Sequence, residues 1–289
     1  LAYRVLLDAE ASSEFYDNAQ KMSVALGNMY RTEFDGKQGE VLAAKAEGMY
    51  GHLAQRYTAY YDYNLGWNKL ISLQKLLPFT VGLFLLVTLS TIFSEYSLKT
   101  DSLLLSSKYG KSKLPQAKAM AAILATTGVW LIIQVVNLLL VAWLFGLQGA
   151  HTFVQNWVYN NSPFAFTHFT HYLAFTFMSF LGALSFAAVI IFTSAKTKSP
   201  FISLLISSMV LLLPVMGGIA NIGGFIGELL YFMPAQMLIA ANHFIFFKAY
   251  YILGNAILMQ HLVLVVAIVA ATLMVPIACR TFQQWQVES

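Results

Sequence analysis

Long apolar runs without a charged side chain alternate with short charged stretches along this chain. Asp, Glu, Lys and Arg are absent from 119–195, 199–227 and 249–279. An uncharged apolar run of about 18 or more residues is long enough to cross a bilayer as a helix. The pattern predicts five membrane-spanning helices, at about 76–93, 119–145, 172–192, 201–219 and 257–277.

The first 64 residues follow a different pattern. Acidic and basic residues are interleaved there with alanine and leucine, and helix formers dominate at about 5–30 and 39–61. The sequence FDGK at 34–37, between these runs, is typical of a turn. We therefore expect a short helical hairpin outside the membrane, followed by an aromatic cluster at the membrane interface.

The apolar segment 220–256 is long for a loop that contains so few polar side chains. Backbone groups without hydrogen-bond partners are not tolerated in lipid. We expect short re-entrant helices here that dip into the outer leaflet and break near Pro234.

Composition agrees with a membrane protein. The chain is 58% hydrophobic and 10% charged, whereas soluble domains have about 25% charged residues. We predict an all-α, polytopic helical membrane protein with an extracytoplasmic helical segment at 1–65 and a transmembrane domain at 66–289. The single cysteine, Cys279, excludes an internal disulfide.

Basic residues near the predicted spans are distributed unequally, and such residues favour the cytoplasmic side. One side would carry Lys99, Lys108, Lys111, Lys113, Lys118, Lys196, Lys198 and Arg280, and the other only Lys69, Lys75 and Lys248. This places the N-terminal segment outside and the C-terminus in the cytoplasm of, we expect, a bacterial plasma membrane. A further span before Leu1, giving six, is the simplest explanation of an outside N-terminus.

The basic stretch 99–118 contains Gly-Lys-Ser at 110–112, the ending of a phosphate-binding loop. Such a loop needs glycine at 105 and a preceding strand, but position 105 is leucine and the upstream segment is a predicted span. We expect neither nucleotide nor nucleic-acid binding, because membrane topology and attraction to anionic lipid explain the lysines. Thr100 or Asp101 is expected to cap a short amphipathic helix at about 101–108.

Other polar residues suggest several kinds of site. His168 and His171 have helical ligand spacing, but no carboxylate or cysteine lies nearby, so interfacial histidines are preferred to a metal site. Glu228 is the one acid of segment 220–256, and ionisable residues at membrane depth are functional candidates. A translocation path or helix-to-helix hydrogen bonds would explain the polar residues within the apolar spans, which are Gln134, Asn137, Ser179 and Ser185.

The block 93–118, with Glu95 ending one span, a leucine-rich short helix, a basic turn and Lys118 opening the next span, resembles the ABC-2-type permeases. These are the membrane subunits of ATP-binding cassette (ABC) exporters. The resemblance implies a coupling helix near 97–108 that contacts a cytoplasmic ATPase subunit. The expected contact residues are Glu95, Lys99, Asp101, Leu103, Leu104, Lys108 and Lys111.

The resemblance further implies that this chain has no ATPase site, catalytic residue or cofactor of its own. ATP and magnesium would bind the partner ATPase, and a second permease subunit, identical or different, would complete the assembly in the lipid bilayer. A peptide or a hydrophobic or amphipathic compound is the expected cargo. Two alternatives stay open: a non-transporting receptor or sensor with the outer hairpin as its ligand site, and an intramembrane enzyme.

Overall fold

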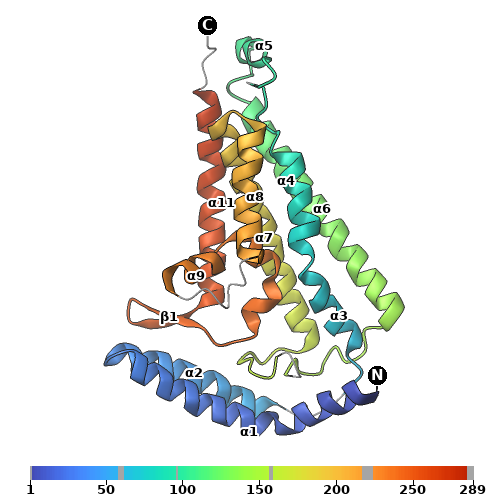
Figure 1. The fold of residues 1–289 in the computed structure, drawn as a ribbon, viewed down its shortest axis with the longest axis vertical. Coiled ribbons are helices and arrows are strands. Elements are labelled where there is room, and N and C mark those ends of the chain that lie inside the picture. Colours follow the sequence, from blue (N-terminus) through green and yellow to red (C-terminus); the bar gives the residue numbers. More distant parts are fainter. Residues whose placement is uncertain (1, 58–61, 96, 156–158, 217–223, 285–289) are drawn as a thin grey trace. The chain divides into compact units, whose positions relative to one another are not determined.

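A computed structural model describes residues 2–57, 62–95, 97–155, 159–216 and 224–284, with the backbone alone at 2–13, 16, 101, 102 and 105. The described chain is mostly helical (Figure 1). Two compact units divide it, and each is assembled from three stretches of sequence. Unit 1 comprises Leu1–Ser72, Leu139–Phe175 and Ala240–Leu262, and unit 2 comprises Leu73–Leu138, Thr176–Ile239 and Val263–Ser289. These units differ from the predicted division into an outer segment, 1–65, and a transmembrane domain, 66–289, in which each part is one continuous stretch. Which residues lie in a membrane stays a prediction.

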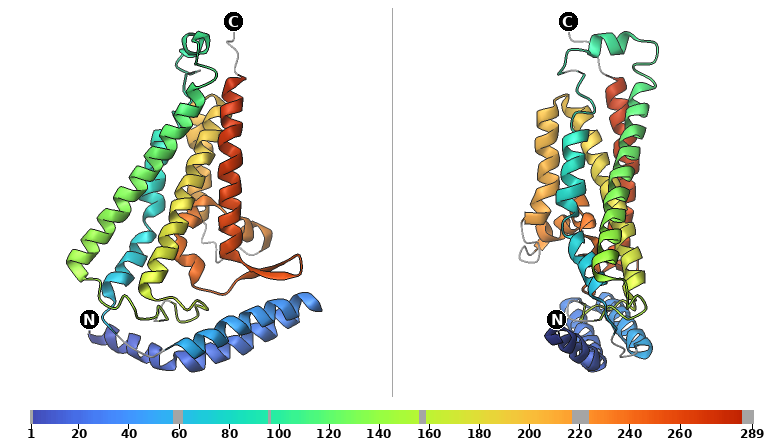
Figure 2. Two further views of the ribbon diagram at one scale, coloured as in Figure 1. Left: turned by 180° about the vertical axis from the view of Figure 1, so that it is seen from behind. Right: turned by 90° about the vertical axis from the view of Figure 1, so that its right-hand side faces the viewer.

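Unit 1 contains a helical hairpin of α1 (Ala2–Glu33) and α2 (Lys37–Arg56), which lie side by side in both views of Figure 2. The turn expected at 34–37 separates them, and Gly36 has the positive φ of 59° that glycine tolerates best. Arg31 pairs with both Glu40 and Glu47 across the hairpin. The helical hairpin expected from the pattern is therefore present.

The rest of unit 1 contains a β-hairpin, so the all-α prediction is wrong in detail. Strand β1 (Ala249–Ile252) pairs antiparallel with β2 (Asn255–Leu258). Short helices expected within 220–256 are present earlier in the sequence, as α9 (Gly224–Tyr231) and α10 (Pro234–Leu238). Leu253 and Gly254, with φ of 49° and 86°, make the two-residue turn, and positive φ at both positions matches the twist of paired strands. The tyrosines and isoleucine of β1 are good strand formers.

The buried face of α2 forms the core of unit 1, together with residues from the β-hairpin. Tyr50 is buried there beside Phe15, Leu42 and Leu53. Its hydroxyl donates a hydrogen bond to the carbonyl of Asn161 at 2.6 Å, which links α2 to the segment that precedes α7 (His168–Thr197).

Replacing Tyr50 with phenylalanine is expected to lower the free energy of unfolding by about 1 kcal/mol at neutral pH, because this hydrogen bond is lost. Burial raises the pKa of Tyr50 above its ordinary value of 10.0. Above pH 10.0 the unfolded chain loses this proton while the folded chain keeps it. The stabilisation from Tyr50 is therefore complete below pH 10.0 and is lost as pH rises further.

Thermal unfolding in detergent on either side of pH 10.0 tests this prediction. The Tyr50→Phe variant should lose less stability than the unaltered protein as pH rises, since it has one phenol fewer to ionise. Tyr109, which is exposed, provides the control at neutral pH, where Tyr109→Phe should leave the free energy of unfolding nearly unchanged. An equal alkaline loss in Tyr50→Phe would contradict the assignment.

Unit 2 is built mainly from long helices that run alongside one another (Figure 1). It includes α4 (Leu83–Leu89), α5 (Asp101–Ser106), α8 (Pro200–Met216), α9 (Gly224–Tyr231) and α10 (Pro234–Leu238), and parts of α3 (Leu65–Gln74), α6 (Leu114–Phe145), α7 (His168–Thr197) and α11 (Met259–Gln283). A π-helical turn, Pro78–Gly82, precedes α4. The core of unit 2 contains Leu85, Phe93, Phe186, Leu211 and Phe282.

Four helices of the described chain are long and apolar enough to cross a membrane: Leu65–Leu89, Leu114–Phe145, His168–Thr197 and Met259–Gln283. The first begins at Leu65 rather than near 76, because Lys69 lies within α3; a short turn at Lys75 and Leu76 separates α3 from the helical segment that follows. The predicted span 201–219 corresponds to the shorter apolar helix Pro200–Met216, and 217–219 lie outside the described residues. A helical membrane protein is thus supported, whereas five spans stay a prediction.

Candidate functional site: the basic connector and its ion pair

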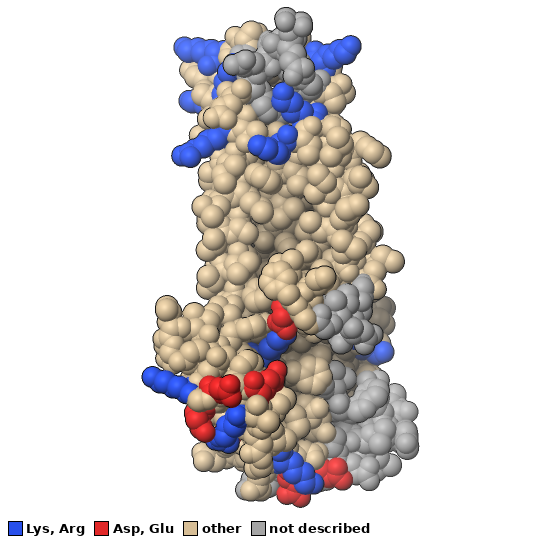
Figure 3. All heavy atoms as spheres, turned by 60° about the vertical axis from the view of Figure 1, so that its left-hand side comes forward, with Lys and Arg blue, Asp and Glu red and all other residues tan. Residues whose placement is uncertain are grey.

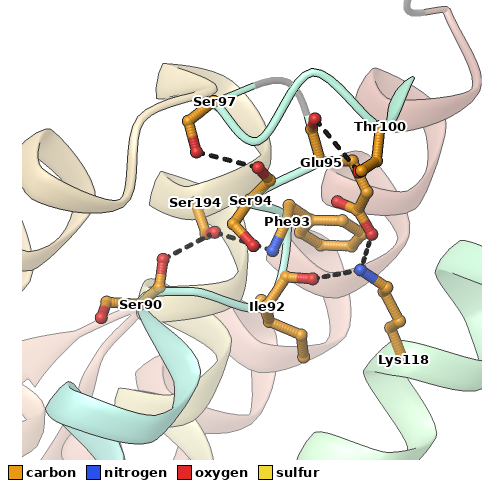
Figure 4. A network of polar contacts seen from close by, with 9 residues as sticks. All are labelled: Ser90, Ile92, Phe93, Ser94, Glu95, Ser97, Thr100, Lys118 and Ser194. Carbon is orange, nitrogen blue, oxygen red and sulfur yellow. Dashed lines mark hydrogen bonds and ion pairs between the residues drawn. The ribbon is translucent and has the colours of Figure 1, made fainter. Parts of the chain in front are cut away.

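The basic connector, residues 94–113, links the turns at 90–93, which follow α4, to α6. The side chain of Phe93 is fully buried against Phe282, with ring centroids 5.0 Å apart. Ser194 of α7 accepts a hydrogen bond from the Phe93 backbone N–H at 3.2 Å and donates one to the Ser90 carbonyl at 3.0 Å (Figure 4). These bonds satisfy backbone groups that the end of a helix leaves without intrahelical partners.

Glu95 and Lys118 form an ion pair at the entry to the connector (Figure 4). Lys118 lies in the first turns of α6, and its ammonium also donates to the Ile92 carbonyl at 2.5 Å. Glu95 is 5% exposed, and the Lys118 ammonium lies 5.4 Å from the centre of the Phe93 ring. A buried carboxylate needs such a partner, because removal from water is costly for a charge.

Backbone hydrogen bonds fold the connector back on itself. The Thr100 N–H donates to the Glu95 carbonyl at 3.0 Å, and the Gly110 N–H donates to the Ser107 carbonyl at 3.2 Å. A Cβ atom at Gly110 would lie 1.7 Å from the Leu104 carbonyl oxygen, so only glycine fits there.

The predicted helix at about 101–108 is present as the shorter α5. Thr100 is its N-cap residue, but its side chain makes no cap hydrogen bond and donates instead to the Glu95 carbonyl at 3.4 Å. The capping expected of Thr100 is therefore wrong, and the side chain of Asp101 lies outside the described residues.

The connector presents apolar and basic side chains together on its surface. Leu98 is 66% exposed and Leu103 is 75% exposed, while Leu104 is half-buried. Lys99, Lys108 and Lys111 are exposed as well. Lysine and arginine side chains gather at this end of unit 2, next to a surface without charged side chains (Figure 3). An exposed leucine among lysines is suited to contact with another protein surface.

The structure brings together two of the polar residues assigned to a possible path. Ser179 accepts hydrogen bonds from Trp130 at 3.1 Å and Gln134 at 3.3 Å, and the Gln74 amide donates to Gln134 at 3.4 Å. Both Gln134 and Ser179 are buried. Their hydrogen bonds join α6 to α7, as polar side chains between membrane helices commonly do.

The other path residues are not part of these hydrogen bonds. Ser185 is buried further along α7, Asn137 is half-buried on α6, and Glu228 is half-buried on α9. A translocation role for any of the five stays a prediction. Sequence reasoning missed Trp130 and Gln74, although their polar groups lie within or beside apolar runs.

The two histidines are buried in unit 1. His168 is 2% exposed, and its Nε2 lies 3.3 Å from the Asn64 amide nitrogen, while the His171 ring packs against Tyr159 and Phe175. Both are buried in the protein rather than exposed on its surface, and the interfacial interpretation stays a prediction. Within the described part of the chain, no three His, Cys, Asp or Glu residues are placed to hold a metal ion.

Comparisons with known proteins return no match to a family model, to a curated protein or to a solved structure. The likeness of 93–118 to the ABC-2-type permeases therefore stays a prediction. What the connector can do follows from its own contacts: it is exposed on one side, and Glu95 and Lys118 tie its entry to α6.

Proposed function

We propose that this chain is the transmembrane subunit of an ABC exporter, which moves a peptide or a hydrophobic or amphipathic compound across the membrane. A separate cytoplasmic ATPase subunit would bind and hydrolyse ATP with magnesium. The supporting observation is the connector, which exposes Leu98 and Leu103 and is held at its entry by a buried ion pair between Glu95 and Lys118. A docking surface is thereby attached directly to the helices that must move.

The contacts of the connector suggest how movement would pass to those helices. Lys118 bonds both Glu95 and the Ile92 carbonyl, so a displacement of the connector pulls on α6 and on the segment after α4. Ser194 ties the same segment to α7. Because separation of a buried ion pair costs several kcal/mol, the helices would follow the connector rather than detach from it.

The proposal places the connector in the cytoplasm, where an ATPase is available. The excess of lysine at this end of unit 2 supports this orientation. The exposed apolar surfaces of α6 and α11 also fit a membrane subunit. Only 17% of the most apolar stretch of α6 and 22% of that of α11 are buried inside the structure. The exposed remainder is available to lipid and to a second permease subunit, identical or different.

Copurification with an ATPase tests the proposal. The tagged chain, extracted from the membranes of its source cells, should retain an ATPase subunit and stimulate its hydrolysis of ATP. Leu103→Asp is expected to reduce both by about ten-fold or more, because an exposed interface leucine would be replaced by a charge. The matched control is Leu253→Asp, since Leu253 at the tip of the β-hairpin is 96% exposed and should tolerate the change.

Recovery of the chain without any ATPase would contradict the proposal, as would equal effects of the two substitutions. The first result would favour a non-transporting receptor. A groove of about 400 Å³ in unit 1 suits that second candidate, because Lys45, Met49 and His52 of α2 line it with Phe164. Ligand binding by the outer hairpin without ATP hydrolysis would then be the expected activity.

A further inference from the structure

A groove lies between the start of α6 and the end of α11, within unit 2. One face of each helix lines it, since the α6 residues recur at intervals of three and four positions. The lining residues are Gln116, Ala119, Met120, Ile123, Val275, Pro276, Cys279, Arg280 and Gln283. Its volume is about 380 Å³, which is within the range of small-molecule sites.

Small side chains form the floor of the groove, and hydrogen bonds close one end. Ala119 and Cys279 are buried, and the Cys279 thiol donates to the Pro115 carbonyl at 3.6 Å. The Gln283 amide donates to the Ser112 carbonyl at 3.5 Å. The C-terminal turns of α11 are thus tied to the connector and to the first turn of α6, so the groove is built into the fold.

The groove is polar at one end and apolar along its length. Gln116, Arg280 and Gln283 lie at the connector end, while Ile123 and Val275 lie further along the two helices. Seven residues separate Gln116 from Ile123, and this corresponds to about 10 Å along a helix. A ligand that fits must therefore have a polar head and an apolar tail with roughly this spacing.

The charge of the groove lining favours ligands with an anionic head. No acidic side chain lines the groove, and Arg280 makes no ion pair with any carboxylate in the part of the chain that the structure describes. The backbones of Lys111 and Lys113 flank Ser112, which accepts the bond from Gln283. Basic pockets between membrane helices attract anionic headgroups by about 1 kcal/mol for each lysine or arginine.

We propose that this groove binds an anionic phospholipid, with its phosphate against Arg280 and one acyl chain along Met120, Ile123 and Val275. The lipid would join α6 to α11 beside the connector. The inference requires a bilayer but not an ATPase, so it stands or falls independently of the exporter proposal.

Photo-crosslinking tests the site. The full chain is reconstituted into phosphatidylcholine vesicles that contain a minor fraction of phosphatidylglycerol with a diazirine on one acyl chain. Mass spectrometry should place the crosslinks on Met120, Ile123 and Val275. Tagged phosphatidylcholine should label these positions several-fold less, since it lacks the net negative charge.

Four variants separate the roles of headgroup and tail. Arg280→Gln should lower labelling by phosphatidylglycerol about five-fold, Arg280→Lys should restore it, and Lys196→Gln at the same end of unit 2 should not change it. Ile123→Trp, which fills the groove, should abolish labelling by either lipid, provided that the variant elutes and melts like the unaltered protein. Equal labelling by the two lipids, labelling elsewhere, or indifference to Arg280→Gln would overturn the proposal.

Discussion

Replacing Lys118 with methionine is expected to lower the free energy of unfolding by about 3–5 kcal/mol, because it leaves a buried carboxylate without its ion-pair partner. The Glu95 side chain is 7% exposed, and its second oxygen, Oε2, has no hydrogen-bond partner among the described residues. Methionine retains the length and packing of the lysine stem but supplies no charge. The loss would be a large share of a typical total stability of about 5–15 kcal/mol.

Removing the charge of the other partner, Glu95, should lower the free energy of unfolding by less. Glu95→Gln leaves the Lys118 ammonium bonded to the Ile92 carbonyl, and the Lys118 side chain is 23% exposed, so water still reaches it. The double variant Glu95→Gln/Lys118→Met removes both charges and should recover most of the stability lost in Lys118→Met. Thermal unfolding of the four proteins in one detergent measures these differences as a double-mutant cycle.

The prediction is tested by comparing how much stability each single variant loses. If Glu95→Gln destabilises the protein as much as Lys118→Met, the cost does not come from an unpaired buried carboxylate. If the effects are additive, the two residues do not interact. If the exporter proposal holds, Lys118→Met should also uncouple the ATPase while the subunits remain bound, since the exposed face of the connector is unchanged.

The helical part of the fold was predictable from the sequence, because uncharged apolar runs and helix formers act over many consecutive residues. Two features were not predictable in this way. Helix α3 begins at Leu65, ahead of the predicted span, since a single lysine, Lys69, does not stop a helix. The β-hairpin at 249–258 has only four residues in each strand, too few for a clear alternation of apolar and polar positions.

The candidate site was predictable in part. Glu95 and Lys118 were candidates because they are charges at the ends of apolar runs. Their ion pair was not predictable, since they lie 23 positions apart in the sequence and only the packing of the chain brings them together. Sequence spacing likewise could not reveal that Trp130 and Gln134 of one helix share Ser179 of another. The groove between α6 and α11 was not predictable, because its two faces are distant in sequence and neither face has a distinctive residue pattern.

A second large effect is expected at Gly182, where α7 passes very close to α10. A Cβ atom at this position would lie 2.7 Å from the Met237 Cβ and 3.0 Å from the backbone nitrogen of Leu238. Backbone cannot yield as the end of a flexible side chain can. Gly182→Ala should destabilise the protein by about 1–3 kcal/mol, and Gly182→Leu by more.

The surroundings of α10 explain why the strain cannot be relieved cheaply. The Gln236 amide donates to the Pro214 carbonyl at 2.7 Å, and Ala235 and Leu238 are part of the unit 2 core. To accommodate a larger residue at Gly182, α10 must move, and this movement would disrupt the hydrogen bond and the core together. Pro214 lies within α8 and lacks a backbone N–H, so it donates no intrahelical hydrogen bond of its own.

Gly128 of α6 is the matched control, because a Cβ atom there meets nothing within 4 Å. Gly128→Ala should stabilise the protein by about 0.5–1 kcal/mol, since alanine loses less conformational freedom than glycine in a helix. The two glycine-to-alanine changes are chemically identical, so opposite shifts in melting temperature would isolate the contact with α10. A stabilising effect of Gly182→Ala would show that α7 and α10 are not in close contact.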